Sequence, residues 1–232
     1  MEAKIYEFFD KYPKCSGLQV TLSETQANML RCNCEYCKHL NEGDRFLKVA
    51  DTLAKTAQTL EKTIVIRTWG NFEDPVLIKK LPKSIITSTK STLPDFHLTN
   101  YPNPVLGQNS PQEVEFDAWG EYSGFNMFPC YYGDIYEERI KECADMGVER
   151  LGLRLNWEPG VRWIFGNKWG NECNVYLFSK LAQSPNANPD EILKECISKT
   201  YPESSYESAF NLYKRSTHIM TTFLIWNRKK CK

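Results

Sequence analysis

The sequence predicts an α/β protein of the (β/α)8 TIM-barrel type, in which only the later strands of the barrel are present as a partial barrel. Short apolar segments alternate with segments of helical spacing, which is typical of parallel strands joined by helical crossovers. Polar residues follow the strands, and neither G-x-G-x-x-G nor G-x-x-x-x-G-K-[ST] occurs, which disfavours a nucleotide-binding sheet. About five strands are recognisable, whereas a closed barrel of this type has about eight.

The first half of the chain predicts three strands and one long helix. Residues 16–24, "SGLQVTLSE", read as a strand that ends at Glu24. Residues 44–62 place apolar side chains at helical spacing, namely Phe46, Leu47, Val49, Ala50, Leu53, Ala57 and Leu60. Short apolar strands are then expected at 63–70 ("TIVIRTWG") and 83–90 ("KSIITSTK").

The middle of the chain predicts a loop followed by a strand–helix–strand unit. The loop covers residues 91–111 and contains four prolines. A fourth strand is expected at 112–121, an amphipathic helix at 134–147 that ends at Gly147, and a fifth strand at 148–157.

Helices dominate the end of the chain. They are expected at 174–183, 188–201 and 204–228, the second with Asn188 or Asp190 as its N-cap. No Gly/Ser linker divides the chain. We therefore expect residues 1–232 to form a single barrel-like catalytic domain, incomplete at its amino terminus, with a helical part at 174–232.

Composition excludes several classes of partner. The 232 residues include 29 basic and 29 acidic side chains, a balance that gives no electrostatic basis for nucleic-acid binding. No apolar run is long enough to span a membrane. Nine cysteines, without a secretory signal at the start, favour reduced thiols and a cytoplasmic location. Aromatic residues make up 13% of the chain, which favours a carbohydrate or another flat ligand.

Three of the cysteines form the cluster "CNCEYC", which contains Cys32, Cys34 and Cys37. Thiolates at this spacing suit a tetrahedral zinc site, with Cys15 or His39 as a fourth ligand. The usual zinc signature has two C-x-x-C knuckles, however, and this segment has one. Structural thiols or a disulfide are therefore the stronger interpretation.

Charged residues follow the predicted strands, where the reacting groups of barrel enzymes lie. The strand ends are Glu24, Arg67, Lys90 with the nearby Asp95, and Glu121. Alternation along 112–121 would place Glu115, Asp117, Trp119 and Glu121 on one side, with Glu121 nearest the rim. Glycoside hydrolysis needs a proton donor and a second carboxylate, and basic residues in the same pocket suit an anionic sugar.

The order of these motifs resembles that of the α-glucuronidases, which remove glucuronic acid from xylan-derived oligosaccharides. "GLQVTLSE" is similar to the strand that carries the general acid, which implies this role for Glu24. "IVIRTW" is similar to a strand whose arginine helps to bind the uronic acid, which would be Arg67. "TKSTLPDF" matches a segment with a lysine five residues before an aspartate, which implies Lys90 and the base-side residue Asp95.

The resemblance continues to about Thr200. "VEFDAWGEYSG" matches a strand with one glutamate six positions before a second, catalytic one, which would be Glu115 and Glu121. The segment starting "NKWGNECNVYLF" resembles the closing part of the family, with Trp169 in a substrate-pocket loop. The resemblance implies an inverting reaction on an oligosaccharide without metal or organic cofactor. Another exo-glycosidase, of the hexosaminidase type, is an alternative.

The chain also departs from the family. The amino-terminal β domain and the first barrel strands have no counterpart, and "CNCEYC" is foreign to the pattern. A barrel that lacks strands would expose sheet edges and apolar core. The alternative function is therefore a non-catalytic or degenerate relative that binds sugar or a partner subunit, and a missing amino-terminal portion or a homo-oligomer would cover the exposed edges.

Overall fold

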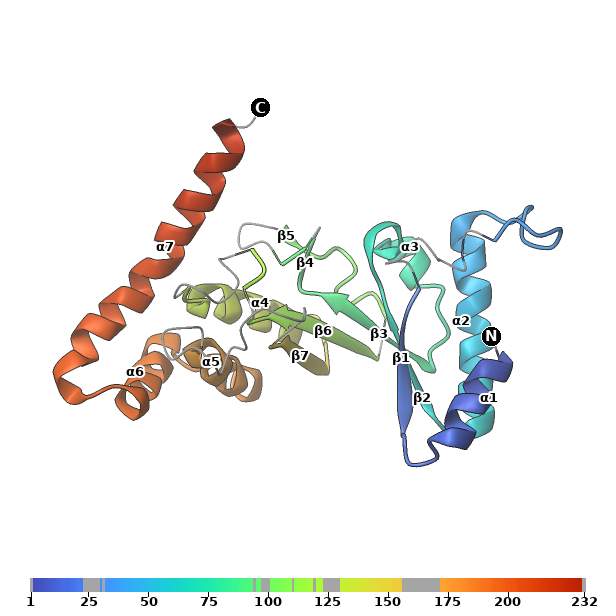
Figure 1. Ribbon diagram of the computed structural model, residues 1–232, viewed down its shortest axis with the longest axis horizontal. Helices are drawn as coiled ribbons and strands as arrows, with labels where there is room; N and C mark the ends of the chain where they lie inside the picture. Colours follow the sequence, from blue (N-terminus) through green and yellow to red (C-terminus); the bar gives the residue numbers. More distant parts are fainter. Residues whose placement is uncertain are drawn as a thin grey trace. The chain divides into compact units, whose positions relative to one another are not determined.

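The computed structural model describes residues 2–22, 30, 32–93, 95–96, 101–109, 111–118, 120–122, 130–155 and 172–230. Within these residues, five strands form one parallel sheet in the order β1-β2-β3-β6-β7 (Figure 1). The strands are β1 (Gly17–Thr21), β2 (Thr63–Arg67), β3 (Ile85–Lys90), β6 (Gln112–Asp117) and β7 (Arg150–Arg154). The predicted α/β class and its five parallel strands are confirmed.

Helices connect and follow these strands. They are α1 (Glu2–Lys11), α2 (Glu42–Leu60), α3 (Pro75–Ile78), α4 (Gly133–Asp145), α5 (Glu172–Gln183), α6 (Pro189–Thr200) and α7 (Tyr206–Lys230). Helices α1 and α3 were not among the predicted elements. In the described ranges, no helix combines the length and the apolar character that a bilayer crossing requires.

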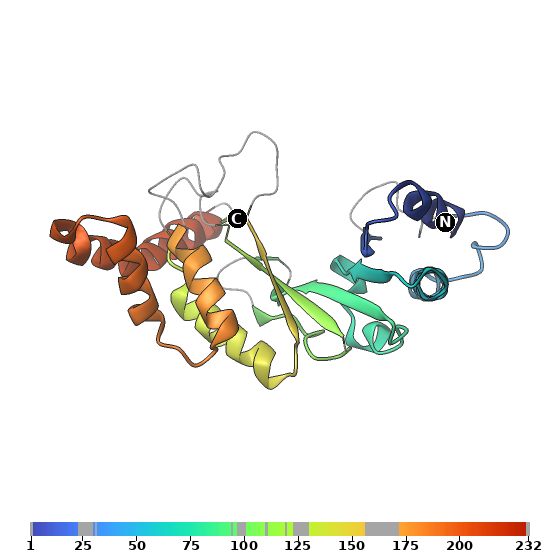
Figure 2. The same cartoon turned by 90° about the horizontal axis from the view of Figure 1, so that it is seen from below.

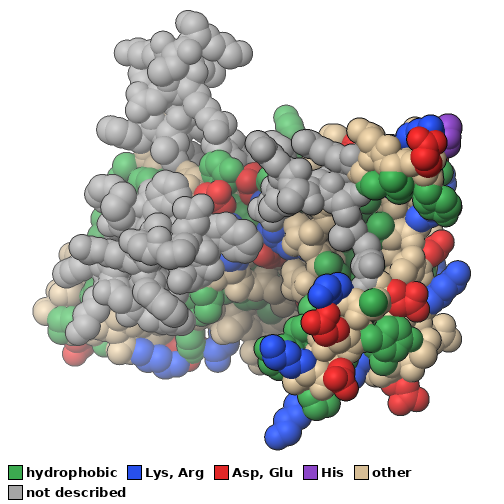
Figure 3. Space-filling model, turned by 45° about the vertical axis from the view of Figure 1, so that its right-hand side comes forward, with side chains coloured by type: hydrophobic (Ala, Val, Ile, Leu, Met, Phe, Trp, Pro, Cys, Tyr) green, Lys and Arg blue, Asp and Glu red, His purple; other side chains and the backbone are tan. Residues whose placement is uncertain are grey.

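The chain divides into two compact units. Unit 1 contains residues 1–89, 103–114 and 148–150, and unit 2 contains residues 90–102, 115–147 and 151–232. Cationic and anionic side chains are interspersed over the described part of the face in Figure 3, as the equal numbers of basic and acidic residues suggest.

Unit 1 is built on the parallel strands β1, β2 and β3, against which α2 packs its apolar side. Ile64 and Ile66 of β2 are fully buried, and Phe46 of α2 stacks on Phe72 with ring centroids 4.7 Å apart. The helix begins where Asn41 accepts a hydrogen bond from the Asp44 amide at 2.8 Å, a typical N-cap. The apolar spacing found in the sequence is therefore the side that forms this core.

Unit 2 has an aromatic core between its part of the sheet and the helices α4 and α5, which lie side by side in Figure 2. Phe116 of β6 contacts Tyr136 of α4 and Phe178 of α5, with ring centroids 5.9 and 5.2 Å away. The fully buried Asn174 of α5 accepts from the Tyr132 amide and donates to the Cys130 carbonyl, which fixes the start of α4.

The predicted fourth strand, residues 112–121, was too long. β6 ends at Asp117, because the Asp117 carboxylate accepts hydrogen bonds from the amides of Gly120 and Glu121, both at 3.1 Å. Gly120 has a positive φ of 81°, which turns the chain back on itself. Strand alternation therefore does not place Glu121, and Trp119 lies outside the described residues.

The predicted loop 91–111 also contains regular structure. Thr92–Leu93 (β4) and Tyr101–Pro102 (β5) form a short antiparallel pair of their own. Of the two N-caps considered for α6, Asn188 is the one used, since its side chain accepts from the amides of Asp190 and Glu191.

Candidate functional site

Lys90, the last residue of β3, forms a buried ion pair with Asp95. Its Nζ lies 2.6 Å from Asp95 Oδ1, and the Lys90 side chain is 5% exposed. The Phe96 amide donates to the same oxygen at 2.9 Å, and Thr92 Oγ1 donates to the Asp95 carbonyl at 2.6 Å. The bonds from Lys90 and the Phe96 amide orient the carboxylate, and the bond from Thr92 fixes the Asp95 backbone.

Tyr122 brings a second segment to Asp95. Its hydroxyl donates to Asp95 Oδ2 at 2.7 Å, so both oxygens of this carboxylate accept hydrogen bonds. Burial, followed by the bond to Asp95, raises the pKa of Tyr122, which keeps its phenol protonated as a donor. Because Glu121 precedes Tyr122 in the chain, this contact places Glu121 in the neighbourhood of Asp95.

Arg154, the last residue of β7, binds two further carboxylates. Its Nε lies 3.2 Å from Asp117 Oδ1, and one of its terminal nitrogens lies 2.6 Å from Glu121 Oε2. Burial lowers the pKa of the guanidinium, but Asp117 and Glu121 outweigh that effect, so the pKa of Arg154 is raised. Arg154 therefore joins the end of β6 to the turn that follows it.

The two carboxylates on Arg154 differ in exposure. The Asp117 side chain is 7% exposed, and the Glu121 side chain is 28% exposed. Burial raises the pKa of Asp117, although Arg154 and the two backbone amides act in the opposite direction. Asp117 is therefore a buried support for the turn, whereas Glu121 can be reached from solvent.

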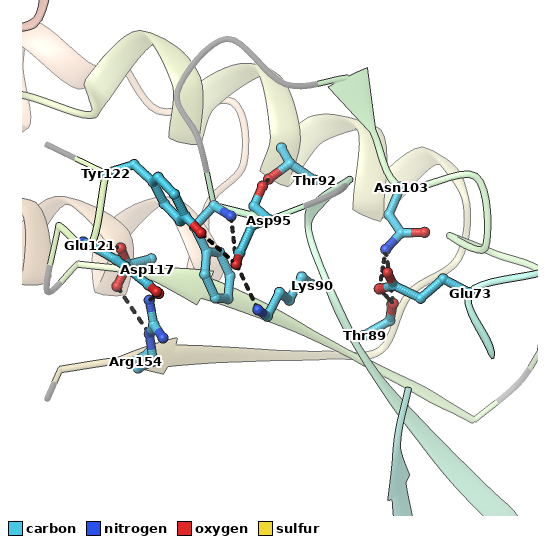
Figure 4. Close-up of polar contacts among 11 residues, drawn as sticks. Glu73, Thr89, Lys90, Thr92, Asp95, Asn103, Asp117, Glu121, Tyr122 and Arg154 are labelled. Atoms are coloured by element: carbon cyan, nitrogen blue, oxygen red, sulfur yellow. Dashed lines mark hydrogen bonds and ion pairs between the residues drawn. The ribbon is translucent and has the colours of Figure 1, made fainter. Parts of the chain in front are cut away.

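The Phe96 ring links the two ion-pair groups. Lys90 Nζ lies 4.8 Å from its centroid, and the guanidinium carbon of Arg154 lies 4.5 Å from it. Both distances are typical of cation–π contacts. Figure 4 shows Lys90 and Tyr122 converging on Asp95, with Arg154 directed at Asp117 and Glu121.

A small cavity of about 30 Å³ adjoins this cluster. Its lining includes Thr92, Phe96, Asp117 and Tyr136. That volume accommodates about one water molecule and is far too small for a sugar ring. A sugar would have to approach Glu121 from its solvent side.

A separate polar group lies within unit 1. Asn103 Nδ2 donates to Glu73 Oε1 at 2.7 Å and to Thr89 Oγ1 at 3.1 Å, and Thr89 itself donates to Glu73 at 3.3 Å. All three side chains are buried. This group ties the end of β3 to the segments around residues 73 and 103, so its role is structural.

The cysteines of "CNCEYC" lie together in unit 1. The sulfur atoms of Cys32, Cys34 and Cys37 are all within 4.8 Å of one another. The Cys37 amide and then the Cys32 thiol, as hydrogen-bond donors, lower the pKa of Cys34 to about 7, while the bond to Cys34 raises the pKa of Cys37 to about 11. In the described part of the chain, this is the group of side chains best suited to hold a metal.

The structure accounts for part of the predicted site. It brings Lys90 and Asp95 into contact and places Glu121 in the same cluster. Arg67 belongs to unit 1, where it ends β2 as a buried residue, in register with Ser88 of β3. Glu24 and Trp169 lie outside the described residues.

Arg154 and Tyr122 also belong to this cluster and were not among the predicted site residues. The fifth strand was expected to continue to residue 157, so Arg154 was placed inside a strand and not at its end. The signal that could have identified it is its position after the alternating Leu151 and Leu153, near the carboxyl end of a predicted strand. For Tyr122, the only sequence signal is that it directly follows the predicted catalytic residue Glu121.

Comparison with known proteins adds no family to this description. No protein-family model matches the sequence, and no curated protein matches it.

Proposed function

We propose that this protein is a glycosidase of the α-glucuronidase type, which hydrolyses a terminal glucuronic acid from xylan-derived oligosaccharides with inversion. The observation that carries the proposal is the cluster at the ends of β3 and β6, where Asp95 and the more exposed Glu121 lie among two cations. The substrate class, glucuronic acid on xylan-derived oligosaccharides, is proposed from the resemblance of the motif order to the α-glucuronidases.

In this reaction a carboxylic acid protonates the leaving oxygen while a carboxylate on the other face of the sugar accepts a proton from the attacking water. Glu24 is the proposed acid, and Asp95 or Glu121, or both, activate the water. Lys90 and Arg67 are the proposed ligands of the uronic carboxylate and hydroxyls, and Trp169 is a proposed wall of the pocket. No metal or organic cofactor is needed for these steps.

The barrel is part of the proposal. The strand order β1-β2-β3-β6-β7 follows the chain without reversal. Doubly wound sheets reverse their order at a switch point, whereas barrels place each strand beside the one before it. The order supports five consecutive strands of a (β/α) barrel, whose active sites lie at the carboxyl ends of the strands, where Lys90 and Arg154 are found.

The ion pairs also favour a second candidate, a non-catalytic relative that binds sugar or a partner subunit. Lys90 Nζ contacts Asp95 at 2.6 Å, and Arg154 contacts Glu121 at 2.6 Å. A carboxylate that must accept a proton from water is less available for this while it is bound to a cation. Under this candidate the same side chains bind hydroxyl groups and perform no chemistry.

Release of free sugar distinguishes the two candidates. Folded protein is incubated with 4-O-methylglucuronoxylo-oligosaccharides and, in parallel, with a panel of aryl hexosaminides. We expect release of the uronic acid and no cleavage of the hexosaminides. Cleavage of the hexosaminides alone would contradict the α-glucuronidase proposal and support an exo-glycosidase of the hexosaminidase type. Binding of the oligosaccharide without release would support the non-catalytic candidate.

A further inference from the structure

Residues 32–40 form an ordered loop in unit 1, and Leu30 is described just before it. Inside it, the amides of Cys37 and Lys38 both donate to the Cys34 carbonyl, at 3.0 and 2.9 Å. This turn places Cys34 and Cys37 close together and returns the chain toward Cys32. The thiols therefore meet because of local backbone hydrogen bonds.

Helix α2 holds both ends of the loop. Arg45 donates to the Leu30 carbonyl at 2.7 Å and to the Leu40 carbonyl at 2.9 Å, and Leu30 is buried. Lys48 donates to the Tyr36 hydroxyl at 2.6 Å and lies 4.7 Å from the centre of its ring. The loop is thus fixed at three points, which lowers the entropic cost of ordering the thiols around a ligand.

We propose that Cys32, Cys34 and Cys37 bind one zinc ion through three thiolates, with the fourth position open to an outside ligand. With zinc–sulfur bonds of about 2.3 Å, tetrahedral geometry separates the sulfurs by about 3.8 Å. The separations here, up to 4.8 Å, require side-chain rotations and no rearrangement of the loop.

The charges around the loop suit this ion. Three thiolates with one Zn²⁺ carry a single net negative charge. Arg45 and Lys48 line the same surface hollow as Cys37 and would offset it. Among the described residues, no histidine, carboxylate or further cysteine joins the three thiols, and Cys15 and His39 are outside the group. In the proposed site, water or another small ligand occupies the fourth position.

Metal analysis and cobalt substitution test the proposal. Protein reduced under anaerobic conditions is titrated with Zn²⁺ and, separately, with Co²⁺, whose thiolate charge-transfer absorption reports sulfur ligands. We expect one ion per chain. Single substitutions Cys32→Ser, Cys34→Ser and Cys37→Ser should each weaken binding by about 100-fold or more, because each variant loses one of the three thiolate ligands. Circular dichroism checks that each variant remains folded.

Cys15→Ser is the matched control. Among the described cysteines outside the loop, Cys15 is partly exposed, as Cys37 is, whereas the others are buried. It should leave the zinc stoichiometry and the cobalt spectrum unchanged. Reduced wild-type protein that takes up no zinc would overturn the proposal. So would binding that persists in the Cys32→Ser/Cys34→Ser/Cys37→Ser triple variant, or a loss of binding in Cys15→Ser equal to that in the loop variants.

Discussion

Asp117 and Glu121 both bind Arg154, but the two carboxylates differ in exposure and in the number of hydrogen bonds that they accept. The Asp117 side chain is 7% exposed, and its two oxygens bind Arg154 and the amides of Gly120 and Glu121. The Glu121 side chain is 28% exposed and contacts Arg154 through one oxygen. Asp117, enclosed by donors, therefore stabilises the turn, whereas Glu121 keeps part of its carboxylate open to solvent, as the proposed catalytic role requires.

The largest effect on activity is expected for Glu121→Gln. Glutamine keeps the shape and an oxygen for Arg154 but cannot accept the proton of the attacking water. We expect turnover on glucuronoxylo-oligosaccharides to fall by roughly 10²–10⁴-fold, with the free energy of unfolding changed by less than about 1 kcal/mol. Steady-state kinetics and urea melts measure the two quantities, and full activity in the variant would remove Glu121 from the mechanism.

Arg154→Met should show the largest effect on stability. Removing the guanidinium leaves the buried Asp117 without its cation, and breaking a buried pair in this way costs about 3–5 kcal/mol. Urea denaturation measures the change. Arg150→Met, on the exposed first residue of the same strand, is the control and should change stability by no more than about 0.5 kcal/mol. Equal losses in the two variants would contradict a special role for Arg154.

The pH dependence of Arg154→Met follows from Asp117. Burial raises the folded-state pKa of Asp117, and Arg154 opposes that rise, so the variant should have a still higher value. A raised folded pKa adds stability that is fully present below the unfolded pKa of about 3.9 and is lost as pH increases through the folded pKa. Relative to wild type, the variant should therefore recover stability as the pH is lowered toward the unfolded pKa. A further loss of relative stability as the pH falls would be inconsistent with a buried Asp117.

Tyr122→Phe should have a smaller effect. The change removes the phenol that donates to Asp95 Oδ2 and leaves a partly buried carboxylate oxygen without that donor, at a cost of about 1–3 kcal/mol. Tyr101→Phe, on a highly exposed tyrosine, is the matched control and should not change the urea midpoint. Indistinguishable midpoints for the two variants would show that the Tyr122 bond does not hold Asp95.

The smallest effect is expected at an exposed ion pair. Lys199 contacts Glu195 at 2.6 Å on α6, a distance as short as that of Lys90 to Asp95, but both side chains are exposed. Solvent screens such pairs, so Lys199→Met should leave the urea midpoint within experimental error. A loss comparable to that of Arg154→Met would mean that burial is not what separates the two kinds of pair.

Much of the fold follows from local patterns. Strand and helix positions were predictable because apolar spacing reflects which side faces the core, as in α2 and β2. The end of β6 was not predictable by alternation, since the Asp117 side chain captures the amides of Gly120 and Glu121 and stops the strand. Short elements such as α3, four residues long, are set by capping and carry little periodicity.

The candidate site was only partly predictable. Lys90 and Asp95 are only five residues apart in the chain, so the sequence around the end of β3 is enough to suggest their contact. Arg154 meets Asp117 from 37 residues away and Tyr122 meets Asp95 from 27 residues away. Such contacts depend on how the strands are paired, which a single sequence does not specify.

The central claim is that this protein hydrolyses a glucuronic acid linkage by direct attack of water. Proton NMR of the reaction with 4-O-methylglucuronoxylo-oligosaccharides follows the released sugar before its anomers equilibrate. We expect the β-anomer of 4-O-methylglucuronic acid to appear first from the α-linked substrate. Folded protein that releases no uronic acid, or that releases the α-anomer first, would contradict it.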